Sequence, residues 1–167
     1  MLFSGESFVT IPNSASLALT TGITLEAWVF PTASTGLEAV LMKEQTGSLV
    51  YALYASSSSS RPMVYFNTRP STNRHRYLSG PAALPLNTWS HLAATCDGVT
   101  LRLYVNGAQV SSQSHTDAII TSTGALRIGG DAVWGEYFRG MIDEVRINNR
   151  ALAPAEILTD IKTGVGQ

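Results

Sequence analysis

The alternation of apolar and polar positions predicts a chain built from short β-strands. In residues 23–30, apolar side chains occupy every second position, and Pro31 ends the run. Similar runs span residues 8–11, 37–43, 49–55, 63–67, 126–129 and 137–147. A period of two sends alternate side chains to opposite faces of a sheet, so each run predicts a strand with one face toward a core. The segment Pro154-Ala-Glu-Ile-Leu predicts one short closing helix, with proline in its first turn.

Two turn dipeptides, Asp97-Gly98 and Asn106-Gly107, predict a double hairpin over residues 89–110. Both dipeptides tolerate the positive φ of tight hairpin turns, and the turns set the register. The predicted pairs are Cys96 with Val99, Ala94 with Leu101, Leu92 with Leu103, Ala108 with Val105, and Val110 with Leu103. One face of the hairpin is then apolar. The other face is predicted to be wet: His91, Thr95, Thr100, Arg102, Tyr104, Gln109 and Ser111.

The fold class follows from the density of strands. About ten to twelve short strands, closely spaced turns and almost no helix predict an all-β fold, an antiparallel two-sheet jelly-roll sandwich with a short C-terminal helix. No internal repeat is visible. At 167 residues, the chain is expected to form a single domain over residues 1–167.

Composition excludes some partners. Charged residues make up 14% of the chain and the formal net charge is −1, which gives no electrostatic basis for binding nucleic acid or an anionic membrane. The sequence contains no run of about 18 apolar residues, the length that a membrane-spanning helix needs, and we expect no membrane insertion. Leu2-Phe3 leads directly into strand-like sequence without a signal peptide, and we expect a module of a larger protein. The single cysteine, Cys96, excludes an internal disulfide and is expected to be a small buried side chain.

Four segments, taken in order, carry a family resemblance. They are Phe8-Val-Thr-Ile-Pro-Asn13, Ile23-Thr-Leu-Glu-Ala-Trp-Val29, the hairpin with Trp89-Ser-His91 and Leu103-Tyr-Val-Asn-Gly107, and Phe138-Arg-Gly-Met-Ile-Asp-Glu-Val-Arg-Ile147. Together they resemble the laminin G-like jelly roll of the concanavalin A-like lectin/glucanase superfamily. The resemblance implies a convex and a concave sheet, often with calcium at the rim, and an extracellular or cell-surface location. It also implies binding of a glycan or protein ligand more often than catalysis.

No carboxylate pair suited to glycoside hydrolysis is apparent. The Glu-x-Asp-x-x-Glu strand of laminarinase-like members of the superfamily is absent. Asp143 and Glu144 are adjacent and would point to opposite faces of a regular strand, whereas a retaining glycosidase needs carboxyl groups about 5–5.5 Å apart. The three histidines, His75, His91 and His115, show no metal-ligand spacing. We therefore expect a binding module and not an enzyme.

Asp143 is the most informative acidic residue. On a regular strand it would share a face with Met141, Val145 and Ile147, where a carboxylate needs hydrogen bonds or a metal ion. One hypothesis is that it accepts backbone N–H groups of a neighbouring loop. The other follows from the resemblance: Asp143 would bind a structural calcium ion, with Glu6 in the Ser4-Gly5-Glu6 turn as second ligand.

Glycan recognition needs flat apolar surfaces and planar hydrogen-bonding groups. Two segments offer both, and loops are where binding residues concentrate. The candidate ligand-binding residues are Trp134, Tyr137, Asp131, Arg74, His75 and Tyr77. Trp134 is the best single candidate, although it would also fit a tryptophan folded onto the edge of the sandwich.

The leading hypothesis is a non-catalytic module that binds glycans through these rim loops, with calcium as a structural cofactor. The alternative is a protein-interaction or structural adhesion module of a surface or extracellular protein. The wet hairpin face, with His91, Arg102 and Tyr104, is a second candidate surface, or else an ordinary solvated sheet face.

Overall fold

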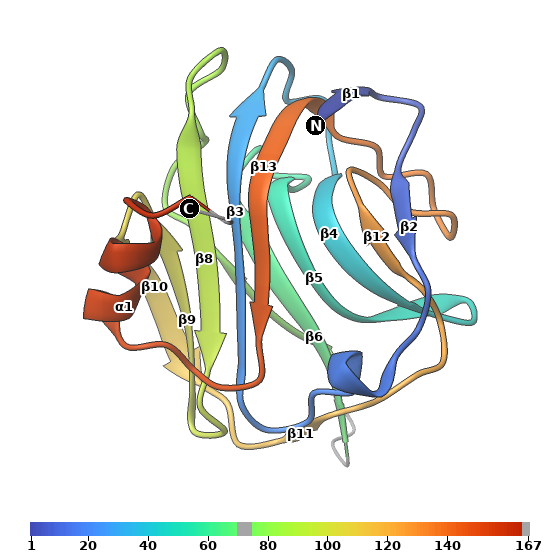
Figure 1. Cartoon of the computed structure of the whole chain (residues 1–167), viewed down its shortest axis with the longest axis vertical. Coiled ribbons are helices and arrows are strands. Elements are labelled where there is room, and N and C mark those ends of the chain that lie inside the picture. Colours follow the sequence, from blue (N-terminus) through green and yellow to red (C-terminus); the bar gives the residue numbers. More distant parts are fainter. Residues whose placement is uncertain (70–74, 165–167) are drawn as a thin grey trace.

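The computed structural model describes residues 1–69 and 75–164 and consists of two antiparallel sheets packed face to face (Figure 1). The first sheet has the order β1 (Leu2–Ser4), β13 (Arg139–Asn148), β3 (Ile23–Pro31), β8 (Ser90–Cys96), β9 (Thr100–Val105) and β10 (Ala108–Ser114). The second has the order β11 (Ala118–Ile119), β6 (Met63–Arg69), β5 (Ser48–Ser56), β4 (Glu38–Gln45), β12 (Leu126–Ile128) and β2 (Val9–Ile11), with β7 (His75–Ser79) paired to β6. A short 3-10 helix η1 (Ala15–Leu17) and helix α1 (Pro154–Asp160) complete the fold. The predicted jelly roll with a short C-terminal helix is confirmed.

The core lies between the sheets and follows the alternation seen in the sequence. Every second residue of β3, from Ile23 to Val29, is fully buried and faces the second sheet. Phe66 and Phe138 are buried in the same cluster, and so is Cys96, as predicted. Burial of each such large apolar side chain contributes about 1.5–3 kcal/mol to folding. In the described part of the chain, no helix has the length and apolar character needed to cross a membrane.

The second hairpin turn has the predicted register, and the first does not. Asn106 and Gly107 adopt φ of 52° and 79°, and Ala108 lies opposite Val105. At the first turn, Cys96 pairs with Leu101 instead of Val99.

The difference at the first turn has a local cause. The Asp97 carboxylate accepts the backbone N–H groups of Val99 (2.8 Å) and Thr100 (2.6 Å), which makes Gly98-Val99 the centre of the turn. The pairing therefore shifts by two residues, and the apolar and polar faces stay as predicted. On the next strand a bulge between Gln109 and Ser111 places Ser111, not Val110, opposite Leu103.

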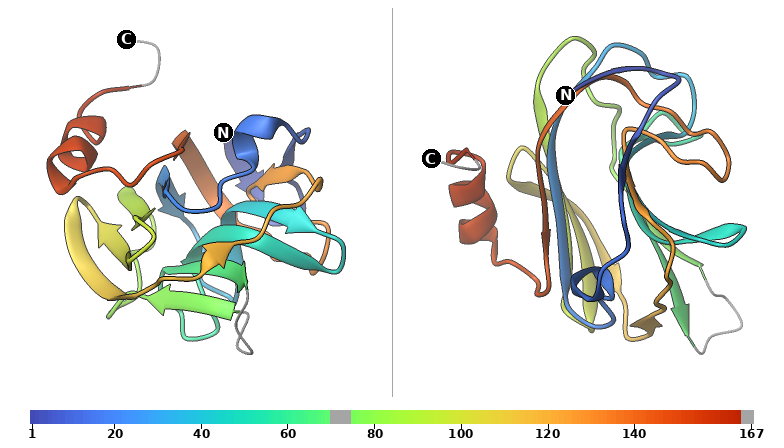
Figure 2. Two further views of the ribbon diagram at one scale, coloured as in Figure 1. Left: turned by 90° about the horizontal axis from the view of Figure 1, so that it is seen from below. Right: turned by 45° about the vertical axis from the view of Figure 1, so that its right-hand side comes forward.

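The predicted wet face of the hairpin is partly covered by α1, which Figure 2 shows against the outer side of the first sheet. Leu152 and Ile157 pack on Ala93 and Tyr104 there, so His91, Thr95 and Tyr104 are at most 1% exposed. Thr24 fixes the approach to the helix: its hydroxyl donates to the carbonyl of Arg150 (2.7 Å) and accepts from the N–H of Leu152 (2.9 Å). The prediction of a solvated face was wrong there because an isolated strand pattern does not reveal what packs on it.

Candidate functional site

The loop between β12 and β13 is organised by one buried carboxylate. Asp131 is 0% exposed. Its Oδ1 accepts the N–H groups of Val133 (2.8 Å) and Trp134 (2.6 Å), and its Oδ2 accepts the N–H of Glu136 (3.0 Å). Both oxygens are therefore used within the loop. Asp131, a predicted ligand contact, instead holds the segment that carries Trp134, whose side chain is 50% exposed.

The same loop is fastened along the outer face of the second sheet. The Glu44 carboxylate accepts the N–H of Ala132 (2.8 Å), and the Ala39 N–H donates to the carbonyl of Glu136 (3.0 Å). The Tyr54 hydroxyl donates to Glu136 Oε2 (2.8 Å). Burial raises the pKa of the Glu136 carboxyl, although its hydrogen bond from Tyr54 lowers that pKa. The loop thus presents Trp134 and Glu136 beside a strand that carries a tyrosine.

Tyr137 forms the base of this loop. Its ring stacks on Phe8 with centroids 6.2 Å apart and an interplanar angle of 4°. The guanidinium of Arg127 lies 4.6 Å from the centroid of Phe8 and pairs with Glu44 (2.9 Å). Tyr137 is therefore engaged in packing the loop, with less of its ring available to a ligand than Trp134.

The other predicted segment lies on the same outer face, where β7 pairs with β6. Tyr77 stands opposite Tyr65, and the Tyr65 hydroxyl hydrogen-bonds His75 Nδ1. Tyr65 is in turn next to β5, on which Tyr54 is opposite Met63. We call Tyr54, Tyr65 and Tyr77 the tyrosine face. Arg74, the remaining candidate, lies outside the described residues.

The solvent exposure of the side chains decreases from one end of the tyrosine face to the other. Tyr77 is 62% exposed, Tyr65 is half-buried and Tyr54 is buried. Burial raises the pKa of Tyr65 to about 12 and also raises that of Tyr54, so both hydroxyls are neutral donors at physiological pH. Tyr54, Tyr65 and Glu136 were not among the residues predicted for the site. Alternation within residues 63–67 would have placed Tyr65 outward, but the contact of Tyr54 with Glu136 joins positions 82 apart and has no local signal.

Asp143 does not share a face with Val145 and Ile147, as it would on a regular strand: these two pack against the core, whereas Asp143 stays on the side of Met141. β13 is bulged: Asp143 lies opposite Trp28, the next described pair is Arg146 with Glu26, and Glu144 has a φ of 50°. Asp143 is exposed on the outer side of the first sheet and accepts the N–H of Glu144 (3.0 Å). The bulge also undoes the argument that Asp143 and Glu144 point apart. Both line a depression of about 310 Å³ together with Trp28 and Trp89.

A calcium ion shared by Asp143 and Glu6 does not fit this arrangement. β1 pairs with β13 from Leu2 opposite Met141 to Ser4 opposite Arg139. Glu6 follows the Arg139 end, whereas Asp143 lies beyond the other end, roughly 13 Å further along the strand. Among residues 1–69 and 75–164, no group of three His, Cys, Asp or Glu side chains is placed to hold a metal ion.

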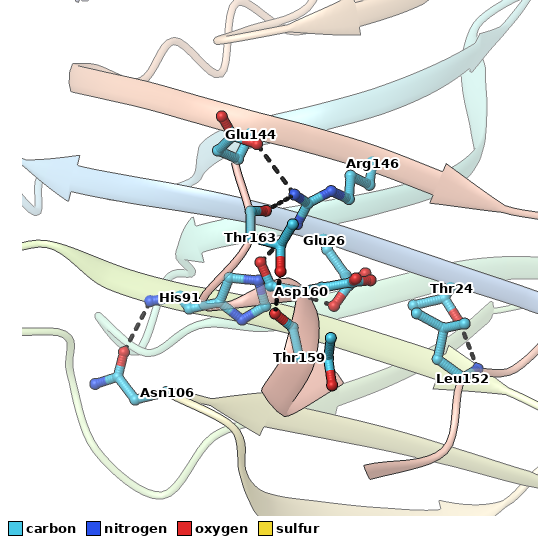
Figure 3. A network of polar contacts seen from close by, with 10 residues as sticks. All are labelled: Thr24, Glu26, His91, Asn106, Glu144, Arg146, Leu152, Thr159, Asp160 and Thr163. Carbon is cyan, nitrogen blue, oxygen red and sulfur yellow. Dashed lines mark hydrogen bonds and ion pairs between the residues drawn. The ribbon is translucent and has the colours of Figure 1, made fainter. Parts of the chain in front are cut away.

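A buried polar cluster lies between α1 and the first sheet (Figure 3). Glu26 and His91 are both 0% exposed, with His91 Nε2 3.8 Å from Glu26 Oε1. Within the described residues, neither carboxylate oxygen of Glu26 and neither ring nitrogen of His91 has a hydrogen-bond partner. Burial, reinforced by the nearby Asp160 carboxylate and opposed by Arg146, raises the pKa of Glu26 to about 7. Burial lowers the pKa of His91 to about 4, so the two groups do not form an ion pair at neutral pH.

Comparison with known proteins identifies a family and several solved structures with a similar fold. The family described as the concanavalin A-like lectin/glucanases superfamily matches residues 3–158. A stretch of 97 residues is 38% identical to pappalysin-1 of Homo sapiens, covering 54% of this chain and 6% of that protein. The match to pappalysin-1 of Mus musculus covers 5% of its length, so the chain spans only a small part of these relatives.

Two solved structures illustrate the shared fold. Domain 4 of AbnA, a GH43 extracellular arabinanase from Geobacillus stearothermophilus in complex with arabinotriose, is similar with a TM-score of 0.75. It is 21% identical, over 95% of this chain and 74% of that one. The CBM40 of the Ruminococcus gnavus IT-sialidase, bound to α2,3-sialyllactose, has a TM-score of 0.71 and 16% identity, over 92% and 97% of the two chains.

Proposed function

The chain belongs to the concanavalin A-like lectin/glucanases superfamily, and on that premise we propose that it is a non-catalytic module that binds a neutral oligosaccharide. The observation that carries the proposal is Trp134, half exposed on a loop that the buried Asp131 holds against the outer face of the second sheet. Two structures of the same fold are named as complexes with arabinotriose and with sialyllactose, which supports a sugar ligand.

The chemistry of this face suits a sugar. The indole of Trp134 and the ring of Tyr77 offer flat surfaces for the C–H faces of a pyranose or furanose ring. Glu136 supplies an acceptor and the exposed Tyr77 hydroxyl supplies a donor for its hydroxyl groups, whereas the hydroxyls of Tyr54 and Tyr65 are engaged by Glu136 and His75. Arg127, which would favour an anionic sugar, is occupied by Glu44 and Phe8, and this favours a neutral one.

The proposal includes the setting of the module. We place it in a larger extracellular or cell-surface protein, supported by its match to a small part of pappalysin-1 and by its likeness to a domain of an extracellular arabinanase. A protein-interaction or structural adhesion role is the alternative. The experiment below separates the two, because that role does not require a sugar.

Replacement of Trp134 by alanine tests the site. We expect Trp134→Ala to weaken binding of a neutral oligosaccharide by about tenfold, or about 1.4 kcal/mol, because one stacking surface is lost. The measurement is a calorimetric titration with arabinotriose and with the best neutral oligosaccharide found on a glycan array. Trp89→Ala is the matched control, since Trp89 is similarly exposed (40%) but lies just before β8 of the first sheet. Failure of the protein to bind any glycan on the array would count against the proposal.

Calcium stays a prediction of the family resemblance, now without a pair of converging side-chain ligands. Because Asp143 and Glu6 lie apart, we expect the melting temperature to be the same in EDTA and in millimolar calcium. A ligand that binds only the folded state must raise the melting temperature. A rise that Asp143→Asn abolishes would restore Asp143 as a ligand, despite the geometry described above.

A further inference from the structure

The outer side of the first sheet is only half covered. Helix α1 packs over the half that contains Ala93 and Tyr104, and no part of the helix lines the half beyond His91. On that half, apolar side chains stand side by side across three strands and the residue that precedes β8. The row consists of Leu2, Met141, Phe30 and Trp89, joined by the strand register and by the contact of Phe30 with Trp89 (ring centroids 5.6 Å apart).

This half-face is more apolar than an ordinary solvated sheet face. Leu2 is 80% exposed and Trp89 40%, while Met141, Phe30 and Trp28 are partly exposed. Exposed apolar surface that is contiguous and bordered by polar residues marks an interaction site more often than isolated exposed side chains do.

Charge at the border indicates what the surface would bind. The bulge in β13 brings Asp143 and Glu144 to the depression that Trp28 and Trp89 also line. Glu144 pairs with Arg146 (3.1 Å), whose guanidinium also donates to the carbonyls of Asp160 and Thr163. Asp143 takes part in none of the ion pairs of the described residues. An exposed carboxylate therefore stands directly opposite an indole.

A guanidinium group fits this combination better than a sugar or a purely apolar group. It is planar, so it stacks on an indole face, and its N–H groups match a carboxylate in a bidentate arrangement. A lysine ammonium would gain the charge attraction but not the stacking or the bidentate geometry. The apolar row beside the depression would receive the neighbouring side chains of the same partner segment.

We propose that the half-face formed by Trp28, Phe30, Trp89, Met141 and Asp143 is a docking surface for a protein segment that presents an arginine between apolar residues. The arginine enters the depression, stacks on an indole and pairs with Asp143. This surface belongs to the first sheet, whereas the proposed glycan site belongs to the second. The inference therefore stands independently of the proposed function.

The test uses two synthetic peptides that differ in one residue, Gly-Leu-Arg-Leu-Gly and Gly-Leu-Glu-Leu-Gly, added to the whole chain labelled with ¹⁵N. We expect the arginine peptide to shift the indole N–H signals of Trp28 and Trp89 in a saturable way, and the glutamate peptide to leave them unchanged. We expect Asp143→Asn to weaken binding at least about fivefold and added salt to weaken it further, as a charge pair at a surface requires.

Two control variants keep the result interpretable. Trp89→Ala should reduce peptide binding without changing glycan binding, and Trp134→Ala should do the reverse. Equal shifts with both peptides would overturn the proposal, because the surface would then be apolar without selectivity for a cation. It would also be overturned if neither peptide shifted the indole signals at millimolar concentration, or if Asp143→Asn bound the arginine peptide as well as the unaltered chain does.

Discussion

Replacing Glu26 by glutamine is expected to raise the free energy of unfolding by about 2–3 kcal/mol more at pH 8 than at pH 5. Glu26 is buried beneath α1 with no hydrogen-bond partner in the described part of the chain (Figure 3). Its pKa is raised from 4.5 to about 7, by burial first and by the Asp160 carboxylate second. Glutamine has the same shape and cannot ionise.

The sign follows from proton binding in the two states. A carboxyl with a raised folded-state pKa holds its proton when the protein is folded and releases it when the protein unfolds. Its contribution to folding is therefore fully present below pH 4.5 and is lost as the pH rises through 7. His91, whose pKa is lowered to about 4, contributes in the opposite direction between pH 4 and 6.5, but it is present in both proteins and cancels in the comparison.

Urea unfolding of the wild type and Glu26→Gln at pH 5 and pH 8 measures the effect. The two proteins should be close in stability at pH 5, and the variant should be the more stable one at pH 8. Glu6→Gln is the control, because this carboxylate is exposed on the connection between β1 and β2. A stability difference between wild type and Glu26→Gln that is the same at both pH values would show that Glu26 does not titrate in the buried cluster.

The second large effect is expected at Asp131, whose replacement by alanine should lower the free energy of unfolding by about 3 kcal/mol. Three backbone N–H groups of the loop, those of Val133, Trp134 and Glu136, donate to this buried carboxylate. Alanine would leave all three without their acceptor. Hydrogen bonds to a charged group are stronger than neutral ones, and buried donors left unpaired add their desolvation penalty.

Asparagine at the same position distinguishes the effect of removing the charge from the effect of removing all the hydrogen-bond acceptors of the side chain. Its side-chain oxygen can keep the two bonds from Val133 and Trp134, but its NH₂ group cannot accept the third bond, from Glu136. The expected order of stability in urea unfolding is wild type, then Asp131→Asn, then Asp131→Ala. Hydrogen exchange at the amides of residues 133, 134 and 136 should accelerate in the same order. Unchanged exchange in Asp131→Ala would mean that Glu44 and Tyr54 hold the loop without Asp131.

What could be predicted from the sequence was local. Alternation over residues 23–30 identified β3 and the inward direction of its apolar residues, and Asn106-Gly107 identified a turn whose backbone adopts the positive φ values expected there. Both features depend on neighbouring residues alone. The segment around His75 shows where this approach stops, because β7 exists through pairing with β6 and not through a strong pattern of its own.

The errors share a cause, which is contact between distant parts of the chain. A regular period of two cannot foresee the bulge at Glu144, which leaves Asp143 on the outer face opposite Trp28 and turns Val145 and Ile147 toward the core. Nor does the polar face of a hairpin reveal that α1 will cover His91, which is 63 positions away from the start of that helix. Trp134 and Tyr77 could be proposed from the sequence because each is an aromatic residue in a polar context, and both are exposed in the structure; their role in binding stays a prediction.

The burial of Cys96 makes the molecule convenient for site-directed spectroscopy. Its thiol is the single one in the chain, it is 0% exposed, and burial raises its pKa. Since the thiolate is the reactive species, maleimide reagents should not react with Cys96 in the folded protein. A cysteine introduced at exposed Val99, or in place of Ala132 on the loop, would then accept a fluorophore or spin label selectively. A probe at position 132 would report ligand arrival at the loop that carries Trp134, and one at position 99, at the far end of β8 from Trp89, would serve as a reference. Neither needs removal of the native cysteine.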